Sequence, residues 1–452
     1  MADEKFDAIV VGAGPAGISA AIAMARAGLN VVVLERGEYP GSKNVQGAVL
    51  YTKMLSDILP EFWKDPNAAL ERHITDQRVL VLSKDSGVQV GFKSDRWMAE
   101  PRNCYTIIRV QFDRWYAAKA EEAGAQIFCG VTVTGCLKKD GKVVGIKTSE
   151  GDEIYADVVI ACDGVNSMLA QQAGLIDEWK SDEVALGVKE ILAMPKEKIE
   201  DRFCLENGEG STTEMFGDIT KGMLGYAFLY TNKESLSIGV GVKLSHLQKT
   251  RVRPYDLLEY VKQHPIVRRM ISGSTAMEYS AHLIPEGGFN SMPPLFADGF
   301  LVGGDAAQMV NPAHREGSNL AMAAGRMAGE TVVEAKKAGD FTAKTLSQYQ
   351  KRLRESFIIP DLYDHRNLET MAEKHLSMLE QGPELLCQSL LDYFTVDGRP
   401  KREAQKGILA RALRNKALHE LVKTEMTWRN AYNFLRTGLK AGSEFLKLRK
   451  AS

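Results

Sequence analysis

A stretch of strand, glycine turn, helix and strand near the N-terminus constrains the fold of this 452-residue chain most strongly. Residues 8–11 form an apolar run with the length of a buried strand, and the pattern Gly-Ala-Gly-Pro-Ala-Gly follows at 12–17. An alanine-rich run at 18–27 has helical character, and a second apolar run at 31–34 ends beside an acid. This order is typical of a βαβ unit that binds a dinucleotide, although a glycine turn alone also occurs in ordinary βαβ units.

Each part of this stretch has a physical role in the predicted site. Gly12 permits the tight turn, Gly14 lets the backbone approach a pyrophosphate, and Gly17 lets the helix pack closely on the strand. The pyrophosphate is expected at the helix N-terminus, where free N–H groups and the helix dipole favour an anion. Glu35 follows the second strand at the distance where an acid accepts hydrogen bonds from a ribose.

Two later segments also place glycine and an acid after a buried strand. Residues 156–161 have the character of a buried strand and lead to Asp163 and Gly164, and the apolar run before Gly304 leads to Asp305. The carboxyl ends of parallel strands meet at one edge of a sheet, where ligands bind. We therefore expect both turns to lie beside the cofactor.

The composition is that of a globular protein with almost no net charge. The net charge is −1 and 44% of the residues are hydrophobic, so nothing indicates a nucleic-acid partner. A charged start, Met-Ala-Asp-Glu-Lys, leads directly into the first strand, and no apolar run reaches ~18 residues. The six cysteines form neither Cys-x-x-Cys nor the spacing of an iron–sulfur ligand set, so we expect reduced thiols, a cytoplasmic protein and no metal site.

A change in the pattern of strand-like and helical runs divides the chain into four expected parts. From about residue 184, strand-like runs follow one another without intervening helices, which predicts an antiparallel sheet. The strand-like runs are 184–194, 221–232 and 235–244. The expected parts are 1–174 (nucleotide-binding domain, first part), 175–280 (antiparallel-sheet domain over the reactive end of the cofactor), 281–340 (nucleotide-binding domain, second part) and 341–452 (helical region with a basic amphipathic tail).

The tail at residues 401–452 holds thirteen Lys or Arg residues against four acids. Aromatic and leucine side chains recur there at helical spacing, which suits an anionic membrane surface or an acidic partner protein. Packing of the same stripe on its own domain is the alternative, and Gly438 and Gly442 weaken the helix. The stripe consists of Trp428, Tyr432, Leu435, Leu439 and Leu446.

The three glycine segments together resemble the FAD-binding fold of p-hydroxybenzoate hydroxylase and its relatives, and Pro15 is typical of FAD-binding versions of the turn. Finer segments are similar to the electron-transfer-flavoprotein–quinone oxidoreductase family, specifically its FixC-type members. The similar segments are 41–47 (GSKNVQG), 187–190 (GVKE), 225–232, 279–288 (YSAHLIPEGG) and 314–319 (HREGSN). The resemblance implies an α/β fold: a Rossmann-like FAD-binding domain of the glutathione-reductase and p-hydroxybenzoate-hydroxylase type, an inserted antiparallel-sheet domain and a C-terminal helical region.

The same resemblance implies a position along FAD for individual residues. Arg109 is expected at the phosphates, the backbone of Val131 at the adenine and Asp305 at the ribityl chain. The helix N-terminus at 317–319 would approach the pyrimidine edge of the flavin, where its dipole stabilises the negative charge of the reduced ring. The loop at 37–50 could face the ring, and it also fits a plain surface turn. The expected FAD-binding residues are Gly12, Gly14, Pro15, Ala16, Gly17, Glu35, Arg36, Lys43, Asn44, Gly47, Arg109, Val131, Asp163, Gly164, Gly304, Asp305, Pro312, Gly317, Ser318 and Asn319.

The implied function is FAD-dependent electron transfer to a membrane quinone, either menaquinone or ubiquinone. The expected donors are electron-transfer flavoprotein subunits, a small ferredoxin-like iron–sulfur subunit, or both. The family's single-chain members carry a C-terminal module with clustered cysteines, whereas this region holds only Cys387, so a cluster is expected on a separate subunit. The resemblance leaves open whether the complex bifurcates electrons, and it implies a peripheral position on the cytoplasmic face of the cell membrane.

Quinone reduction consumes protons, so a titratable group near the site is expected, and His314, His282 and Glu286 are the candidates. Three alternatives share the FAD scaffold: an isoprenoid reductase such as a geranylgeranyl reductase, an NADPH-dependent hydroxylase, and a flavin-bearing docking subunit without quinone chemistry. The hydroxylases carry an arginine where this chain has Ala170, which disfavours direct use of NADPH.

Overall fold

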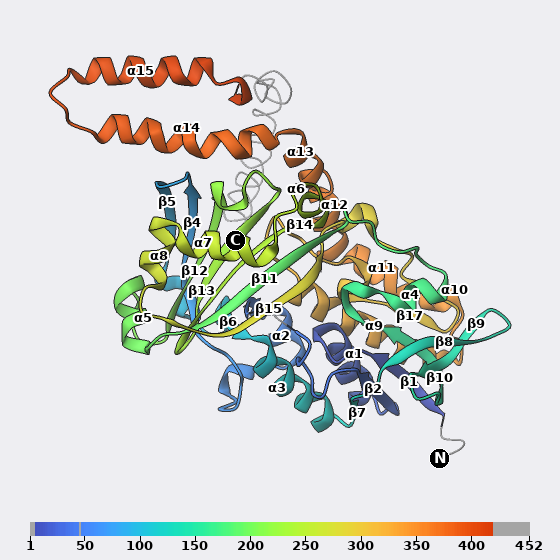
Figure 1. Cartoon of the computed structure of the whole chain (residues 1–452). Helices are drawn as coiled ribbons and strands as arrows, with labels where there is room; N and C mark the ends of the chain where they lie inside the picture. Colours follow the sequence, from blue (N-terminus) through green and yellow to red (C-terminus); the bar gives the residue numbers. More distant parts are fainter. Residues whose placement is uncertain (1–4, 45–46, 419–452) are drawn as a thin grey trace, which may run out of the picture.

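The computed structural model describes residues 5–44 and 47–418, and two large sheets dominate this part of the chain (Figure 1). The first sheet has a parallel centre in the order β17-β10-β1-β2-β7, which is the arrangement of a nucleotide-binding domain. The strands of this sheet are β1 (Phe6–Val11), β2 (Val31–Glu35), β7 (Gln126–Cys129), β8 (Val133–Lys139), β9 (Lys142–Thr148), β10 (Glu153–Ala161), β16 (Phe296–Ala297) and β17 (Phe300–Val302).

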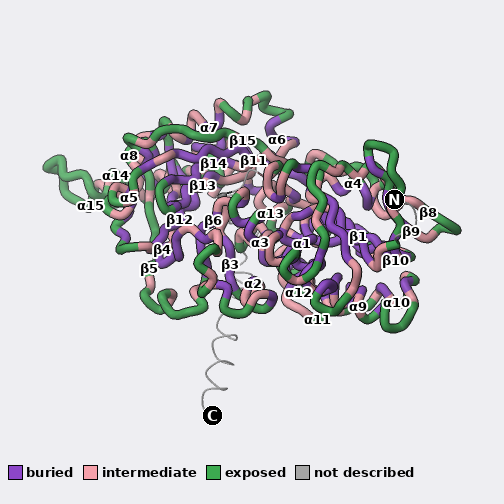
Figure 2. Tube along the Cα trace, turned by 90° about the horizontal axis from the view of Figure 1, so that it is seen from below, coloured by how far each residue is buried: buried purple, intermediate pink, exposed green. Residues whose placement is uncertain are grey.

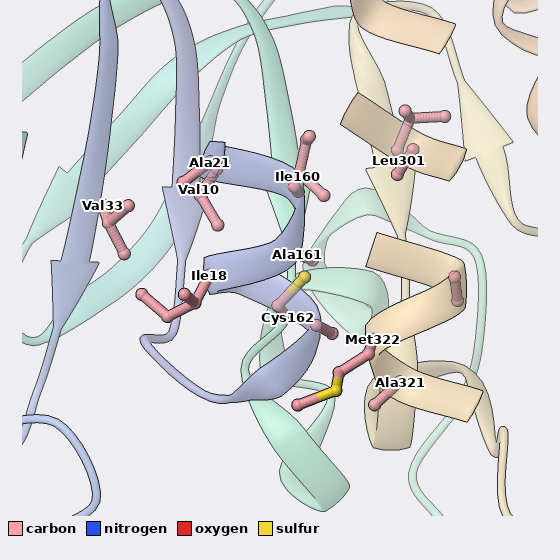
Figure 3. Packing of buried hydrophobic residues seen from close by; sticks show 14 of the residues in the cluster. Val10, Ile18, Ala21, Val33, Ile160, Ala161, Cys162, Leu301, Ala321 and Met322 are labelled. Atoms are coloured by element: carbon pink, nitrogen blue, oxygen red, sulfur yellow. The ribbon is translucent and has the colours of Figure 1, made fainter. Parts of the chain in front are cut away.

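The predicted βαβ unit at the N-terminus is confirmed. Its helix α1 (Pro15–Arg26) lies between β1 and β2 in the chain and packs on α9 (Ser318–Ala338). Figure 3 shows Ile18 and Ala21 of α1 within the buried cluster, together with Met322 of α9. A Cβ atom at Gly325 of α9 would lie 1.9 Å from the carbonyl oxygen of Ala16, so the two helix backbones approach as closely as glycine permits.

The second sheet has nine strands and is mostly antiparallel. The predicted antiparallel sheet of the runs at 184–194, 221–232 and 235–244 is confirmed: they form β11, β13 and β14, and β14 pairs with both of the others. Its strands are β3 (Gly47–Tyr51), β4 (His73–Leu82), β5 (Gly87–Lys93), β6 (Cys104–Ile108), β11 (Val184–Ala193), β12 (Glu209–Gly217), β13 (Gly225–Thr231), β14 (Ser235–Lys243) and β15 (Thr275–Pro285).

The second sheet also contains β3, β4, β5 and β6, which lie between residues 47 and 108. We expected these residues in the nucleotide-binding domain. The link is a parallel pairing of β12 with β4, in register from Glu209 opposite His73 to Gly217 opposite Leu82. Partners more than a hundred residues apart leave no local pattern, so sequence periodicity did not reveal this pairing. The chain therefore passes from one sheet to the other several times. Residues from both sheets and from the connecting segments line the cavities described below.

The C-terminal third is helical, as expected, over the described residues up to 418. Helices α14 (Leu376–Phe394) and α15 (Lys401–Arg414) form a hairpin that projects beyond β4 and β5 in Figure 1, and Figure 2 shows much of its length exposed or half-buried. Among the helices of residues 5–44 and 47–418, none combines the length and apolar character needed to cross a bilayer. The predicted aromatic stripe at 428–446 lies outside the described residues.

The remaining helices surround the two sheets and connect them. Their bounds are α2 (Thr52–Ile58), α3 (Arg109–Glu122), α4 (Met168–Ala173), α5 (Lys196–Phe203), α6 (Leu244–Thr250), α7 (Pro254–Gln263), α8 (Pro265–Ile271), α10 (Ala343–Leu346), α11 (Gln348–Glu355), α12 (Ile358–His365), α13 (Leu368–Lys374), α14 (Leu376–Phe394) and α15 (Lys401–Arg414).

Candidate functional site

Two neighbouring cavities lie at the carboxyl edge of the first sheet. The larger has a volume of about 510 Å³ and extends to the second sheet, and the smaller has a volume of about 170 Å³. Several residues line both cavities, so the two cavities adjoin each other. The shared residues are Gly14, Asn44, Cys162, Gly164 and His282.

The glycine turn forms the wall between the two cavities. Gly12 has φ of 102°, and a Cβ there would lie 2.3 Å from the carbonyl oxygen of Cys162, which directly follows the neighbouring strand β10. A Cβ at Gly14 would meet no atom within 4 Å and would project into open space where both cavities meet. Gly14 precedes the first residue of α1, so the helix N-terminus faces this space. The residues present therefore fit the pyrophosphate of FAD.

Glu35 is held rigidly at the end of the smaller cavity. Its carboxylate accepts hydrogen bonds from the N–H groups of Ala13 at 2.9 Å and Gly37 at 2.7 Å. Each carboxylate oxygen retains further acceptor capacity, which suits a ribose diol. The N–H of Val131 donates to the Glu35 carbonyl at 2.9 Å, so the backbone that was expected at the adenine lies beside the acid.

Asp163 provides a second indication that the smaller cavity binds a polar ligand. One carboxylate oxygen accepts from the N–H of Leu169 at 3.1 Å, while Oδ1 is buried without a hydrogen-bond partner in the described part of the chain. Burial raises the pKa of this carboxyl group. A buried unpaired oxygen is unfavourable, so a donor on a bound ligand would satisfy it.

Arg109 begins helix α3 and lines the larger cavity. Its guanidinium makes a two-point ion pair with Asp113, at 2.7 and 2.8 Å, and is only 6% exposed. Asp305 lines the same cavity; burial raises the pKa of its carboxyl group and the Arg109 charge opposes this shift. Arg109 thus remains charged and fixed, which suits an interaction with phosphate.

The larger cavity continues from these charged groups to the face of the second sheet. Gly187 and Gly241 lie opposite each other in neighbouring strands β11 and β14, and leave a stretch of bare backbone on the cavity wall. Tyr226 and Phe228 of β13 flank this stretch, so the wall combines flat backbone with aromatic surface. Such a wall suits a planar ring.

A buried lysine faces this cavity and was not among the expected site residues. Lys189 of β11 is 6% exposed, and burial lowers its pKa to about 8. Glu278 raises this pKa and Arg109 lowers it. The sequence offered one signal: a lysine within a largely apolar strand-like run, inside the GVKE segment.

A second set of missed residues surrounds Arg315. Its side chain pairs with Glu214 of β12 and donates to Gln77 of β4 at 3.0 Å and to the hydroxyl of Tyr51 at 3.3 Å. Arg315 has φ of 60°, in the left-handed region that non-glycine residues rarely adopt. The loop before α9 is therefore anchored to the second sheet by one side chain, and only the tertiary structure brings these partners together.

The three candidate proton donors occupy different positions. His282 lines both cavities, and burial together with the charges of Arg36 and Arg109 lowers its pKa. Glu286 lines the larger cavity, and burial raises its pKa to about 8. His314 is exposed, stands 3.2 Å from His365 (Nε2 to Nε2), and does not line either cavity.

The other predicted FAD-binding residues divide between cavity lining and support. Gly17 and Gly304 support the turn through close contacts, since a Cβ would lie 2.0 Å from the Gly12 oxygen or 2.9 Å from the Ala16 Cβ. Asn319 is buried in α9, and Gly47 pairs with Ile108 in the second sheet. The lining residues are Pro15, Ala16, Pro312, Gly317 and Ser318 in the larger cavity and Arg36 and Lys43 in the smaller.

Comparison with known proteins identifies the family. The FAD binding domain model matches residues 5–204, the ubiquinone-binding model of the electron-transfer-flavoprotein–quinone oxidoreductases matches 184–284, and the C-terminal domain model of that family and FixC matches 368–429. Protein FixC of Azorhizobium caulinodans is 47% identical over 413 residues, covering 90% of this chain and 94% of the relative. The chain belongs to the FixC family.

Protein FixC of Bradyrhizobium diazoefficiens is 45% identical over 440 residues, covering 96% of this chain and 99% of the relative. Among solved structures, a geranylgeranyl bacteriochlorophyll reductase-like protein from Thermoplasma acidophilum is similar with a TM-score of 0.70 and 21% identity, covering 93% of this chain and 99% of that one. This likeness establishes the fold alone. As a FixC-family member the chain is an FAD-dependent oxidoreductase, and the family supports electron transfer to a quinone.

Proposed function

We propose that this protein transfers electrons through FAD from an electron-transfer flavoprotein, a small ferredoxin-like iron–sulfur subunit, or both, to a membrane quinone. The observation that carries the proposal is the larger cavity, which runs from the N-terminus of α1 at Gly14 to apolar side chains at Leu224, Leu368 and Leu379. One end fits the cofactor, and the other suits the ring and tail of a quinone. Residues of the region matched by the ubiquinone-binding model form much of the wall.

The protein's own residues would bind and orient the two reactants. Glu35, Arg109 and Asp305 would hold the ribose, the phosphates and the ribityl chain, and Gly317 and Ser318 would approach the flavin edge. When bound, FAD takes up two electrons and releases them singly or together. The aromatic and glycine wall excludes water, and this chemistry requires no nucleophilic side chain.

The cysteines favour a separate iron–sulfur subunit. The chain has six cysteines without cluster spacing, and among the described residues no group of three His, Cys, Asp or Glu side chains could hold a metal ion. Because electrons must still reach a flavin enclosed by two sheets, a partner protein has to bring its own redox group close to this chain. We therefore propose a multi-subunit complex, whose capacity for electron bifurcation depends on the donor subunits.

The α14–α15 hairpin supports a peripheral membrane position on the cytoplasmic face. Phe394 is 72% exposed and Val396 is 85% exposed at its tip, and Leu409 and Leu413 are exposed on α15. The basic residues of α15 alternate with this apolar surface, which suits an anionic headgroup layer. Leu379 of α14 also lines the larger cavity, so the same helix would connect the bilayer with the quinone entrance.

The test is reconstitution of the purified complex with a quinone analogue. We expect reduced electron-transfer flavoprotein, or a reduced ferredoxin-like subunit, to drive quinone reduction only when this chain carries FAD. A complex that holds reduced FAD yet leaves quinone oxidised would contradict the proposal, and would instead indicate a docking subunit. Reduction of a geranylgeranyl substrate under the same conditions would indicate the isoprenoid reductase alternative. Flotation with anionic liposomes, with and without residues 397–452, tests the membrane position.

A further inference from the structure

A set of charged residues around the buried Lys243 lies between the larger cavity and the protein surface. Glu286, at the end of β15, lines the cavity together with Lys243 of β14 and Glu369 of α13. The Nζ atom of Lys243 lies 2.5 Å from Glu369 Oε1 and 2.6 Å from Glu373 Oε1. Leu368, which precedes Glu369 on α13, and Leu379 of α14 line the same cavity.

Exposure increases steadily along this set. The side chain of Lys243 is 7% exposed, that of Glu369 is 26% exposed and that of Glu373 is 36% exposed. His246 continues the set, with Nε2 3.8 Å from Glu373 Oε1. Its Nδ1 accepts from the N–H of Leu224 at 3.0 Å, so a neutral imidazole carries its proton on Nε2, toward Glu373. The arrangement connects the cavity with solvent through groups that can exchange protons.

The environment of Glu286 favours its protonated form. Burial raises its pKa to about 8, the Glu369 carboxylate raises it as well, and Lys243 opposes both. Tyr226 of β13 also lies near enough for the two groups to influence each other, and the N–H of Glu286 donates to the carbonyl of Glu183 at 2.9 Å. A carboxylic acid that is neutral at pH 7 and opens onto a substrate cavity is suited to donate a proton.

We propose that Glu286 delivers a proton to the quinone and that Lys243, Glu369 and Glu373 resupply it from solvent. Reduction of a quinone to a quinol requires two electrons and two protons. Oxidation of an anionic reduced flavin supplies both electrons and one proton, so the second proton must come through the protein. Glu286 gives its carboxylic proton to a quinone oxygen, becomes a carboxylate, and regains a proton through the cluster. This inference rests on the proposed quinone reductase function.

The experiment compares Glu286→Gln with the wild-type complex, using two electron acceptors. A quinone analogue takes up protons with its electrons, whereas ferricenium takes up electrons only. We expect Glu286→Gln to slow quinone reduction at least tenfold, because general acid catalysis typically contributes 10²–10⁴-fold. The rate of ferricenium reduction and the FAD content should not change. Glu384→Gln, on an exposed stretch of α14, is the matched control and should leave both rates unchanged.

The pH profile distinguishes proton delivery from a structural role. Wild-type quinone reduction should fall as pH rises through about 8, where Glu286 loses its proton, and this limb should disappear in Glu286→Gln. Glu286→Asp, which keeps a carboxyl group, should recover part of the rate. Equal loss with both acceptors, or an unchanged pH profile in Glu286→Gln, would overturn the inference. Absence of quinone reduction in the wild-type complex would instead refute the proposed function.

Discussion

The two cavities are built by different means. The smaller cavity and the glycine turn use backbone: N–H groups fix Glu35, and Gly12 and Gly14 have no side chain to obstruct a phosphate. The larger cavity uses side chains from many strands, among them Lys189 and Arg315. A site formed by backbone is encoded in one short stretch, whereas a site formed by side chains depends on the packing of distant segments.

This difference predicts different sensitivities. Adding a methyl group to a glycine of the turn should disrupt the site formed by backbone without changing any charge. Removing one charged side chain from the larger cavity should change that cavity and leave the nucleotide-binding turn intact. The following variants test this contrast, from the largest expected effect to the smallest.

Gly12→Ala should have the largest effect. The new Cβ would stand 2.3 Å from the Cys162 carbonyl, and φ of 102° is strained for any residue with a side chain. Backbone strain alone is worth about 1–3 kcal/mol, and the clash adds to it. We expect loss of bound FAD, measured by absorbance at flavin wavelengths, and a lower melting temperature. Normal FAD content in Gly12→Ala would show that the turn tolerates displacement. It would contradict the view that this part of the site depends on bare backbone.

Arg315→Met should destabilise the protein by about 3 kcal/mol, because it leaves the Glu214 carboxylate buried without its partner. The double variant Arg315→Met, Glu214→Met should recover much of this loss, since it removes both charges. Urea unfolding of the two single variants and the double variant measures the coupling. Independent, additive effects of the two substitutions would mean that the loop before α9 does not depend on this pair.

Lys189→Met should stabilise FAD-free protein at pH 7. Burial lowers the pKa of Lys189 to about 8 from an ordinary value of 10.5, so between these two values the unfolded chain binds more protons than the folded chain. The free energy of unfolding therefore rises with pH over this window, and the penalty is complete below it. Removing the charge should raise stability at pH 7 by on the order of 3 kcal/mol. Thermal melts of both proteins from pH 7 to 10.5 measure this dependence. If the stability of Lys189→Met rises with pH as much as that of the wild type, the prediction is wrong.

Gly14→Ala should preserve the fold and weaken FAD binding. Its φ of −82° is ordinary and the added Cβ meets no protein atom within 4 Å, so the methyl group occupies only the space expected for the pyrophosphate. We expect a Kd for FAD at least about tenfold higher, equivalent to 1.4 kcal/mol, with an unchanged melting temperature of FAD-free protein. Gly407→Ala, on the exposed helix α15, is the matched control and should leave the Kd unchanged.

The nucleotide-binding half could be predicted because its signals are local. The run of strand, Gly12 to Gly17, helix and Glu35 lies within one stretch, and the turns after β10 and β17 carry the same pattern of glycine and acid. Parallel pairing of β1 with β10 then brings Gly164 to the same edge. Each inference needed only short-range sequence and the geometry of parallel sheets.

The second half could be predicted only in outline. The antiparallel hairpin of β13 and β14 was visible because no helix separates its strands. The parallel pairing of β12 with β4 was not, because nothing in either strand specifies a partner so far away. The contacts of Arg315 with Glu214 and Gln77 follow from that pairing, so this side-chain set could not be located without the tertiary structure.

The close packing of α1 on α9 has a consequence for biosynthesis. The pyrophosphate turn is translated within the first twenty residues, yet the glycines of α9 that contact Ala16 and Ala20 are at 325 and 329. Strand β17, which completes the parallel core beside β10, also begins only at Phe300. During translation, the growing chain therefore exposes an incomplete cofactor-binding domain until the last third has emerged. FAD can enter a finished site only after α9 has been made, when the strands of the second sheet have already been made.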